Sequence, residues 1–469
     1  MATSTQPQTI GELRASGYRV RSVKEELREN LIARIRSGEP LFPGIVGYEE
    51  TVIPQIENAI LSGQDIVLLG ERGQAKTRIA RSLVMLLDPE LPVVAGCEIN
   101  DDPFHPICMA CQTRIAEEGD ATPIAWLPSD RRYGEKLATP DITIADLIGE
   151  VDPIKVAEGR YLSDELTIHY GMIPRTHRGI FCLNELPDLA ERIQVGLLNI
   201  MEERDVQIRG YKVRLPIDVY VVASANPEDY TNRGRIITPL KDRIGSEIRT
   251  HYPRTIEHEI AIMDAESTPL VVEGMEVIYP KFMKEIIAEI THQARKSSDI
   301  SQRSGVSVRV SISNGENVAS NAVRRSLRLR EKTAVPRVSD LPSVIASTAG
   351  KIELDTLGDA REDKVVTKLI NQSVLTVFDR YFTREEFEQL LAGFERGLNV
   401  QTSDMLPSME YVTQLSRVGG LRAAVAKLDG HGNPATVASA VEFILEGLHL
   451  NRRLNKDMNA GNTRYRRDR

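Results

Sequence analysis

Apolar residues recur along the first half of the chain with two different periodicities. They follow helical spacing in residues 23–37, which end at Gly38, and again in residues 76–87. Three shorter runs are apolar without a break, as in strands buried on both faces of a parallel sheet: residues 66–69, 180–183 and 219–225. Strand-like and helical segments therefore alternate, which predicts an α/β fold with a parallel sheet flanked by helices.

Length and composition narrow the class of protein. A chain of 469 residues with an ordinary soluble composition predicts two or three domains. No apolar run approaches the roughly 20 residues of a membrane span, and the N-terminus lacks the basic-then-apolar order of a signal peptide. We therefore expect a cytoplasmic protein without a membrane partner.

Charge is distributed unevenly. The formal net charge of -8 argues against nucleic acid as the general partner. The tail at residues 451–469, however, carries seven basic and two acidic residues with almost no apolar content. This composition predicts a disordered, solvated tail, and an interaction arm is the alternative.

The segment after the first apolar run nearly matches a phosphate-binding loop. The pattern G-x-x-x-x-G-K-[ST] finds Gly70, then Ala75 in place of the second glycine, then Lys76 and Thr77. Strand, loop and helix follow one another here, so backbone N–H groups would point at phosphates. Alanine fits position 75 if its φ is negative, because a positive φ costs energy for a residue with a Cβ. A chance glycine-bearing loop is the alternative.

Polar residues end the other two buried strands. Asn184 and Glu185 follow the second apolar run, and Asn226 follows the third. The carboxyl ends of parallel strands border the ligand crevice of such sheets. Glu185 is placed to orient an attacking water, whereas Asn184 stands where an aspartate would normally hold the magnesium shell. As alternatives, Glu185 is an acid at the start of a helix and Asn226 is a turn residue.

Three of the four cysteines lie within one short segment. Cys108 and Cys111 have the spacing of a zinc site, and Cys97 with His105 would complete four ligands. The distance in sequence from Cys97 to Cys108 matches no zinc module that we recognise. Two readings stand: a Zn²⁺ site, or three reduced cysteines in a loop.

In combination, these elements resemble the AAA+ ATPases, and within them the branch of the MoxR ATPases and the ATPase subunit of magnesium chelatase. Four segments within residues 42–340 carry the resemblance: FPGIVGYEE at 42–50, GERGQAKT at 70–77, and the segments 146–185 and 223–253. MoxR-like loops also have alanine before the lysine. The resemblance thus implies that alanine is an accepted residue at position 75.

The resemblance implies ATP and Mg²⁺ as cofactors and assigns residues to them. Val46 and Gly47 would border the adenine, and Thr77, Asn184 and Glu185 would lie at the magnesium ion. The phosphates would lie on the loop formed by Gly70, Glu71, Arg72, Gly73, Gln74, Ala75, Lys76 and Thr77.

Catalytic roles are implied in the same way. Glu185 would activate the water, and Asn226 would be the first sensor. Arg243 would be the arginine finger that reaches the γ-phosphate of a neighbouring subunit, with Arg233 and Arg235 as rivals. Arg309, which follows Ser307, would be the second sensor and would begin a helix of the lid.

We expect four parts along the chain: an N-terminal helical extension at 1–40, an α/β core at 41–265 with an insertion at about 88–140, an α-helical lid at 266–360, and a C-terminal helical region at 361–469 that ends in the basic tail. The C-terminal region is not explained by the resemblance. Implied partners are further copies of the chain in a ring, with a hexamer expected, a separate protein bearing a von Willebrand A domain, and a protein client.

Two other functions remain open. In the first, Asn184 makes hydrolysis negligible, and ATP acts as a switch that orders the assembly. In the second, the chain is an AAA+ transcription activator, although its sequence has no GAFTGA-like loop and its acidic balance counts against DNA binding.

Overall fold

The computed structural model describes residues 6–152, 167–207, 214–227, 235–355, 362–383, 385–430, 432–459 and 462–467. The chain forms two compact units, Met1–His251 and Tyr252–Arg469. Among the described residues, no helix combines the length and apolarity needed to cross a membrane.

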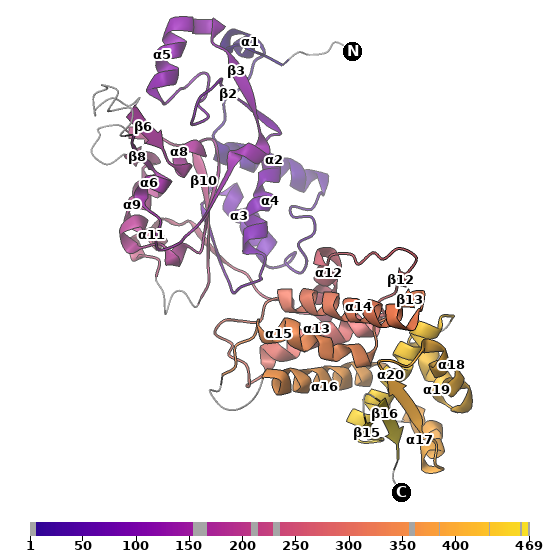
Figure 1. Cartoon of the computed structure of the whole chain (residues 1–469). Coiled ribbons are helices and arrows are strands. Elements are labelled where there is room, and N and C mark those ends of the chain that lie inside the picture. The colour runs from indigo at the N-terminus through magenta and orange to yellow at the C-terminus, as the bar shows by residue number, and fades with distance from the viewer. Residues whose placement is uncertain are drawn as a thin grey trace. The chain divides into compact units, whose positions relative to one another are not determined.

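A five-stranded parallel sheet forms the centre of the first unit (Figure 1). Its order is β11 (Ser246–Arg249), β1 (Ile66–Leu69), β10 (Val219–Ala225), β7 (Gly179–Asn184) and β4 (Tyr133–Leu137). Every residue of β1 and β7 is buried, which accounts for their unbroken apolar sequences. The predicted α/β fold is confirmed.

Alternate residues of each strand face two separate cores. Ile66 and Leu68 pack against α2 (Val23–Ser37), α3 (Val52–Leu61), α4 (Lys76–Ser82) and η1 (Leu83–Leu86). Val67 and Leu69 pack against α6 (Ile144–Leu147), α8 (Met172–Arg175), η5 (Leu186–Asp188), α9 (Glu191–Glu202) and α11 (Thr238–Arg243). Helices thus cover both faces of the sheet (Figure 1).

Three smaller pairs of antiparallel strands accompany this sheet. β2 (Glu90–Val94) pairs with β3 (Ile124–Pro128), near α1 (Ile10–Ala15), α5 (Met109–Glu118), η2 (Gly119–Ala121) and η3 (Ser129–Arg132). The other pairs are β5 (Gly149–Val151) with β6 (Ile168–Tyr170), and β8 (Asp205–Gln207) with β9 (Arg214–Pro216). β8 and β9 pair in antiparallel fashion, and residues 208–213 between them lie outside the described residues.

The second unit is mainly helical and has one continuous core. Its helices are α12 (Ile256–Glu266), α13 (Lys281–Lys296), α14 (Arg309–Leu329), η6 (Val338–Ser343), α15 (Val344–Ala349), α16 (Glu362–Tyr381), η7 (Glu385–Phe387), α17 (Glu388–Glu395), α18 (Ser408–Arg417), α19 (Leu421–Lys427) and α20 (Pro434–Leu450). Two short strands, β12 (Glu276–Val277) and β13 (Thr333–Ala334), pair in parallel.

The described residues of the C-terminal tail, 451–459 and 462–467, include two strands, so the prediction of a disordered tail was wrong for them. β16 (Asn462–Arg466) lies between β14 (Val400–Ser403) and β15 (Asn455–Asn459) in an antiparallel sheet. Tyr465 is only 3% exposed, and its hydroxyl donates to the carboxylate of Glu446, which also pairs with Lys456. One buried aromatic residue and the strand hydrogen bonds therefore order a segment that is otherwise polar.

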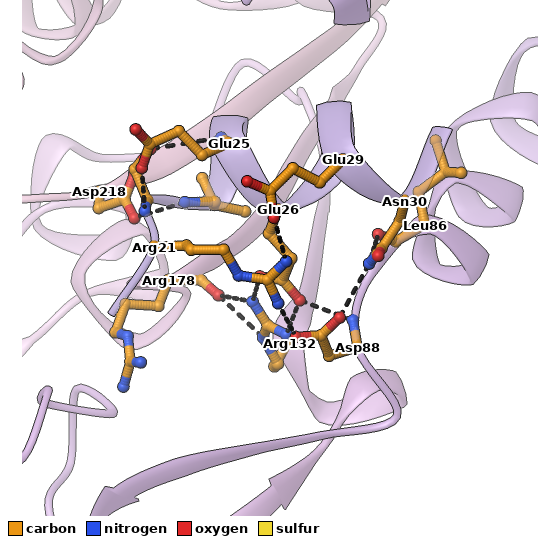
Figure 2. Close-up of polar contacts among 12 residues, drawn as sticks. Arg21, Glu25, Glu26, Glu29, Asn30, Leu86, Asp88, Arg132, Arg178 and Asp218 are labelled. Atoms are coloured by element: carbon orange, nitrogen blue, oxygen red, sulfur yellow. Dashed lines mark hydrogen bonds and ion pairs between the residues drawn. The ribbon is translucent and has the colours of Figure 1, made fainter. Parts of the chain in front are cut away.

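A buried arginine joins several segments at the amino-terminal end of the sheet (Figure 2). Arg132, directly before β4, donates to both carboxylate oxygens of Glu26 on α2, at 2.7 and 2.5 Å. It also donates to the carbonyl oxygen of Arg178, directly before β7, at 2.9 and 2.6 Å. Glu26 in turn accepts from the backbone N–H of Asp88, at 2.6 Å. The side chains of Arg132 and Glu26 are 0% and 3% exposed, so each charge depends on the other.

We predict that Arg132→Met destabilises the first unit by about 3–5 kcal/mol, because it leaves the carboxylate of Glu26 buried without its partner. The midpoint of urea unfolding measures this effect. Trp126 lies in β3 and is the only tryptophan in the sequence, so its fluorescence reports on the first unit.

Arg14→Met is the matched control, because Arg14 and its partner Asp120 are both 63% exposed. An exposed pair contributes at most about 1 kcal/mol. The double variant Glu26→Leu/Arg132→Met removes both charges and should be more stable than Arg132→Met alone. Equal losses for Arg14→Met and Arg132→Met would contradict the role given to the buried pair.

Candidate functional site

The loop after β1 is closed by contacts that require a glycine at its start. A Cβ on Gly70 would lie 1.9 Å from Oγ1 of Thr250 and 2.2 Å from Oε1 of Gln74. That Gln74 oxygen accepts hydrogen bonds from Thr250 Oγ1, at 2.7 Å, and from the backbone N–H of Glu71, at 3.1 Å. The loop is thereby attached to the residue that follows β11. A cavity of about 430 Å³ lies beside it and is bordered by Gly70, Glu71 and Gln74.

The segment expected to border an adenine is attached to the same loop. The hydroxyl of Tyr48 lies 3.0 Å from the carbonyl oxygen of Gln74 and 2.7 Å from that of His251. Burial raises the pKa of Tyr48 to about 12. Val46 and Gly47 directly precede this tyrosine, and Gly47 has a φ of 84° that suits a glycine. Tyr48 was not singled out from the sequence.

Ala75 does not meet the condition set for it. Its φ is 57°, in the left-handed region, where a Cβ approaches the following carbonyl oxygen. Gly73, in the same loop, has a φ of 75°. A negative φ, under which alanine would fit without cost, is therefore not found, and residue 75 has a left-handed conformation despite its methyl group.

Lys76 and the two polar strand ends form one connected group. Lys76 is 7% exposed, and its Nζ donates to the carbonyl oxygens of Gly70 and Glu71 and to Oδ1 of Asn226, at 2.6 Å in the last case. Nδ2 of Asn226 donates to Oε2 of Glu185 at 2.7 Å. The structure therefore brings a lysine, an amide and a carboxylate together at the carboxyl ends of β1, β7 and β10. Glu185 has a φ of 57°, which is strained for a residue with a side chain.

Oxygen atoms gather beside Thr77. Oδ1 of Asn184 accepts from Oγ1 of Thr77 at 3.5 Å and from Oγ of Ser224 at 3.2 Å. Nδ2 of Asn184 donates to Oε1 of Glu135, on the neighbouring strand β4, at 2.7 Å. Sequence reasoning missed Glu135, although its carboxylate lies directly beside the amide that replaces the expected aspartate.

The environment of Glu135 favours its ionised form. Partial burial opposes the charge, but hydrogen bonds and the positive charge of Arg81 outweigh it, with smaller contributions from Tyr133 and Asn184. The pKa of Glu135 is therefore held below its usual range. Arg81 donates to its two oxygens at 2.7 and 2.9 Å.

Two of the arginines expected to act on a neighbouring subunit, Arg243 and Arg235, contact acidic residues of the same chain. Arg243 ends α11, and its Nε donates to Glu202 of the same chain at 2.6 Å. The rival Arg235 is 75% exposed and lies 3.5 Å from Glu191, while Arg233 lies outside the described residues. Arg309 is exposed at the first residue of α14, in the second unit, and its N–H donates to Oγ of Ser307 at 3.2 Å.

The cysteine segment is brought together, but His105 is not part of the group. Its side chain is 76% exposed and lies 3.9 Å from Asp102. Cys97, Cys108 and Cys111 converge with Asp101 instead. The expected fourth ligand was therefore wrong, because spacing in the sequence does not show which side chain of the loop points inward.

We predict that Ala75→Gly raises stability by up to about 1 kcal/mol. It relieves roughly 1–2 kcal/mol of left-handed strain and increases the chain entropy of the unfolded state by roughly 0.4–1 kcal/mol. Ala33→Gly, at an exposed position inside α2, is the control and should lose about 1 kcal/mol. Thermal unfolding of both variants measures the two effects. A loss in both would show that Ala75 is not strained.

Comparison with known proteins gives one family match and several similar relatives. The family profile of the sigma-54 interaction domain matches residues 158–245. Magnesium-chelatase subunit ChlI-1 of Arabidopsis thaliana is 26% identical over 237 residues, which are 49% of this chain and 52% of that protein. Subunit ChlI of Nostoc sp. is 28% identical over 48% of this chain and 58% of its own length. A ChlI homolog of Methanocaldococcus jannaschii is 26% identical over 52% and 63%. The chain thus spans between about half and two thirds of these relatives.

The solved structures that match are less similar to this chain than the relatives above. NtrX from Brucella abortus has a TM-score of 0.39 at 15% identity and covers 74% of this chain and 66% of its own. A cryo-EM-based model of the complex between subunits BchI and BchD of magnesium chelatase has a TM-score of 0.37 at 17% identity, covering 69% and 98%. Because these scores are low, the relationship rests on the sequence matches and on the parallel sheet with its loop after β1. By these matches the chain is similar, over about half of its length, to the ChlI subunits of magnesium chelatase.

Proposed function

We propose that this chain binds ATP with Mg²⁺ and hydrolyses it within a ring of identical subunits. The observation that carries the proposal is the connected group of Lys76, Asn226 and Glu185, because it places a cation, a sensor amide and a carboxylate around one point. Phosphoryl transfer to water needs little more than positioning and charge stabilisation, which are the tasks that such groups perform.

Lys76 would hold the β- and γ-phosphates. Its Nζ is buried and already surrounded by oxygen atoms, so phosphate oxygens would replace these neutral acceptors with charged ones. The N–H groups of residues 70–75 would add donors to the phosphates. Val46 and Gly47 would lie at the adenine, since Tyr48 attaches their segment to the loop.

The oxygen-rich group beside Thr77 fits a magnesium ion, which prefers oxygen ligands and nearby carboxylates. Thr77 and Asn184 would supply the oxygens expected from the sequence. We assign to Glu135 the negative charge that Asn184 lacks, because its carboxylate lies 2.7 Å from the Asn184 amide. Bound magnesium would neutralise charge that develops on the phosphates.

Glu185 would orient the attacking water and accept its proton. Asn226 now donates to this carboxylate, which fixes the orientation of Glu185. Arg243 would reach the nucleotide of the next subunit after leaving Glu202. Arg309 would be the second sensor.

We propose the client, the ring size and the partner protein by analogy with related ATPases. A MoxR-type or chelatase-type ATPase would couple hydrolysis to the remodelling of a protein client or to metal insertion, with a hexameric ring and a separate protein bearing a von Willebrand A domain as partners. The BchI–BchD complex supplies a precedent only for pairing between magnesium chelatase subunits. A cytoplasmic location is part of the same proposal.

Two alternatives have observations in their favour. Asn184 favours an ATP-gated switch with little turnover. The match to the sigma-54 interaction domain favours a transcription activator, and salt-dependent binding of DNA would support it.

We predict that Lys76→Ala and Glu185→Gln lose ATPase activity in different ways. Lys76→Ala should weaken nucleotide binding, because the buried ammonium is lost. Glu185→Gln should retain binding and lower kcat by about 10²–10⁴-fold, as expected for loss of a general base. Steady-state ATPase assays and binding of a fluorescent ATP analogue separate these effects. Tight binding with negligible turnover by the wild type would support the switch instead.

For Glu135 we predict a loss of metal affinity rather than of nucleotide contacts. Glu135→Gln keeps the shape and the hydrogen bond to Asn184 but removes the charge. Electron paramagnetic resonance of Mn²⁺ bound with ADP should show weaker binding by about ten-fold or more, with metal-free ADP affinity unchanged. Glu29→Gln is the control, because Glu29 on α2 is also an acid paired with an arginine, Arg21 at 2.7 Å, and lies by the Arg132 group at the amino-terminal end of the sheet (Figure 2). Unchanged Mn²⁺ affinity would remove Glu135 from the proposed site.

Mixing two inactive variants tests directly whether Arg243 of one subunit acts at the active site of its neighbour. Arg243→Ala should lower kcat by about 10³–10⁵-fold, and Glu185→Gln is inactive for a different reason. Mixed rings would contain intact sites that receive an intact Arg243 from a neighbour, so mixing should restore activity. No recovery in mixtures that co-elute on size exclusion would exclude Arg243 as a trans-acting finger. Arg235→Ala tests the rival arginine in the same assay.

A further inference from the structure

Three cysteine sulfurs and one carboxylate meet between β2 and α5 in the first unit. The ligand atoms of Cys97, Asp101, Cys108 and Cys111 all lie within 4.8 Å of one another. Zinc–sulfur bonds of about 2.3 Å in a tetrahedron place neighbouring sulfurs about 3.8 Å apart. The spacing of these four groups therefore suits a single ion after a small inward adjustment.

The hydrogen bonding of the Asp101 carboxylate is a second, independent indication of a bound cation. Asp101 is 0% exposed, and its Oδ2 accepts from the backbone N–H of Cys108 at 3.0 Å. Its other oxygen, Oδ1, is buried and has no hydrogen-bond partner. A buried acceptor without a donor is costly. A cation at the centre of the four groups would satisfy this oxygen.

Backbone N–H groups point at two of the sulfurs. Sγ of Cys97 accepts from the N–H groups of Ile99 and Asp101, each at 3.4 Å. Sγ of Cys108 accepts from the N–H of Cys111, also at 3.4 Å. Such hydrogen bonds stabilise sulfur as thiolate, which is the form that binds metal, and they fix the direction of its lone pairs.

We propose that Cys97, Asp101, Cys108 and Cys111 bind one Zn²⁺ ion. Thiolate ligands select zinc over magnesium or calcium, and four protein ligands leave no open position for a substrate. The ion is therefore structural. This site is separate from the proposed ATPase site and does not depend on it.

The contacts of the segment show what the ion would stabilise. Nδ2 of Asn100 donates to the carbonyl oxygen of Arg175, at the end of α8, at 2.9 Å. Asp102 lies 3.4 Å from Arg178, which directly precedes β7. Cys108 and Cys111 belong to the same apolar core as Phe181 of β7. Zinc would thus hold the insertion against the strand that ends in Asn184 and Glu185.

The test begins with the metal content of the purified full-length protein. Inductively coupled plasma mass spectrometry should find about one zinc per chain. Cys108→Ser and Asp101→Asn should lower zinc occupancy at least several-fold. His105→Ala is the matched control, because this residue lies in the same loop but is exposed, and it should retain the metal.

A measurement on the wild type avoids variants that do not fold. After zinc is removed with a chelator, added Co²⁺ should produce the visible absorption of a tetrahedral ion and a thiolate charge-transfer band. Removal of zinc should also lower the unfolding temperature reported by Trp126, which pairs with Pro92 of β2.

The proposal is overturned if the folded protein contains no metal and its Cys97, Cys108 and Cys111 thiols all react with a thiol reagent. Iron in place of zinc would also overturn it. Loss of zinc in His105→Ala with retention in Asp101→Asn would overturn the assignment of the fourth ligand. None of these outcomes depends on ATPase activity.

Discussion

The buried pair of Arg132 and Glu26 is the constraint on which the geometry of the first unit depends. Arg132 lies before β4 and binds the carbonyl oxygen of the residue before β7, so it fixes the amino-terminal ends of both strands. In the resulting parallel register, Glu135 is opposite Cys182 and Leu137 is opposite Asn184. Glu26 belongs to α2, and it also accepts a hydrogen bond from the backbone N–H of Asp88. The pair therefore also contacts the residues that follow α4 and η1. The positions of polar groups at one end of the sheet are thus set by a polar contact at the other.

The elements of this unit that could be predicted are those in which burial or helix capping determines the order of apolar and polar residues. β1 and β7 are buried on both faces, so their sequences are continuously apolar, and polar residues mark their ends. The helix at 23–37 was found with its limits because Ser22 and Glu25 form a capping box and Gly38 ends the helix at a φ of 73°. β4 was missed because it is an edge strand whose residues, YGEKL, are largely only half-buried. Glu135 was missed for the same reason. Unless β4 is recognised as a strand of the sheet, nothing in the sequence indicates that this acid lies beside Asn184.

Elsewhere, tertiary contacts outweigh local preference. The segment SISNG is poor helix material, yet it lies inside α14. Two of its polar side chains are buried with partners: Ser311 donates to Glu259 at 2.6 Å, and Asn314 donates to Thr348 at 2.9 Å. In the C-terminal tail, the burial of Tyr465 likewise outweighs the polar composition of the segment. Such pairings join residues far apart in the chain, so spacing and composition do not reveal them. The cysteine group was predicted only in part for the same reason: the three cysteines were recognised, but the residue that lies with them is Asp101 rather than His105.

The place of β16 has a consequence for the order in which the chain folds during synthesis. The central sheet of the first unit is complete once β11 has been made, at Arg249, so this unit can form while the rest of the chain is still being translated. The second unit cannot finish so early, because β14 and β15 both pair with β16, which ends at Arg466, and because Tyr465 belongs to its core. Until those residues leave the ribosome, β14 has an open edge and Glu446 lacks its tyrosine. The second unit therefore completes its folding only after β16 has left the ribosome, whereas the first can fold before the second unit has been made.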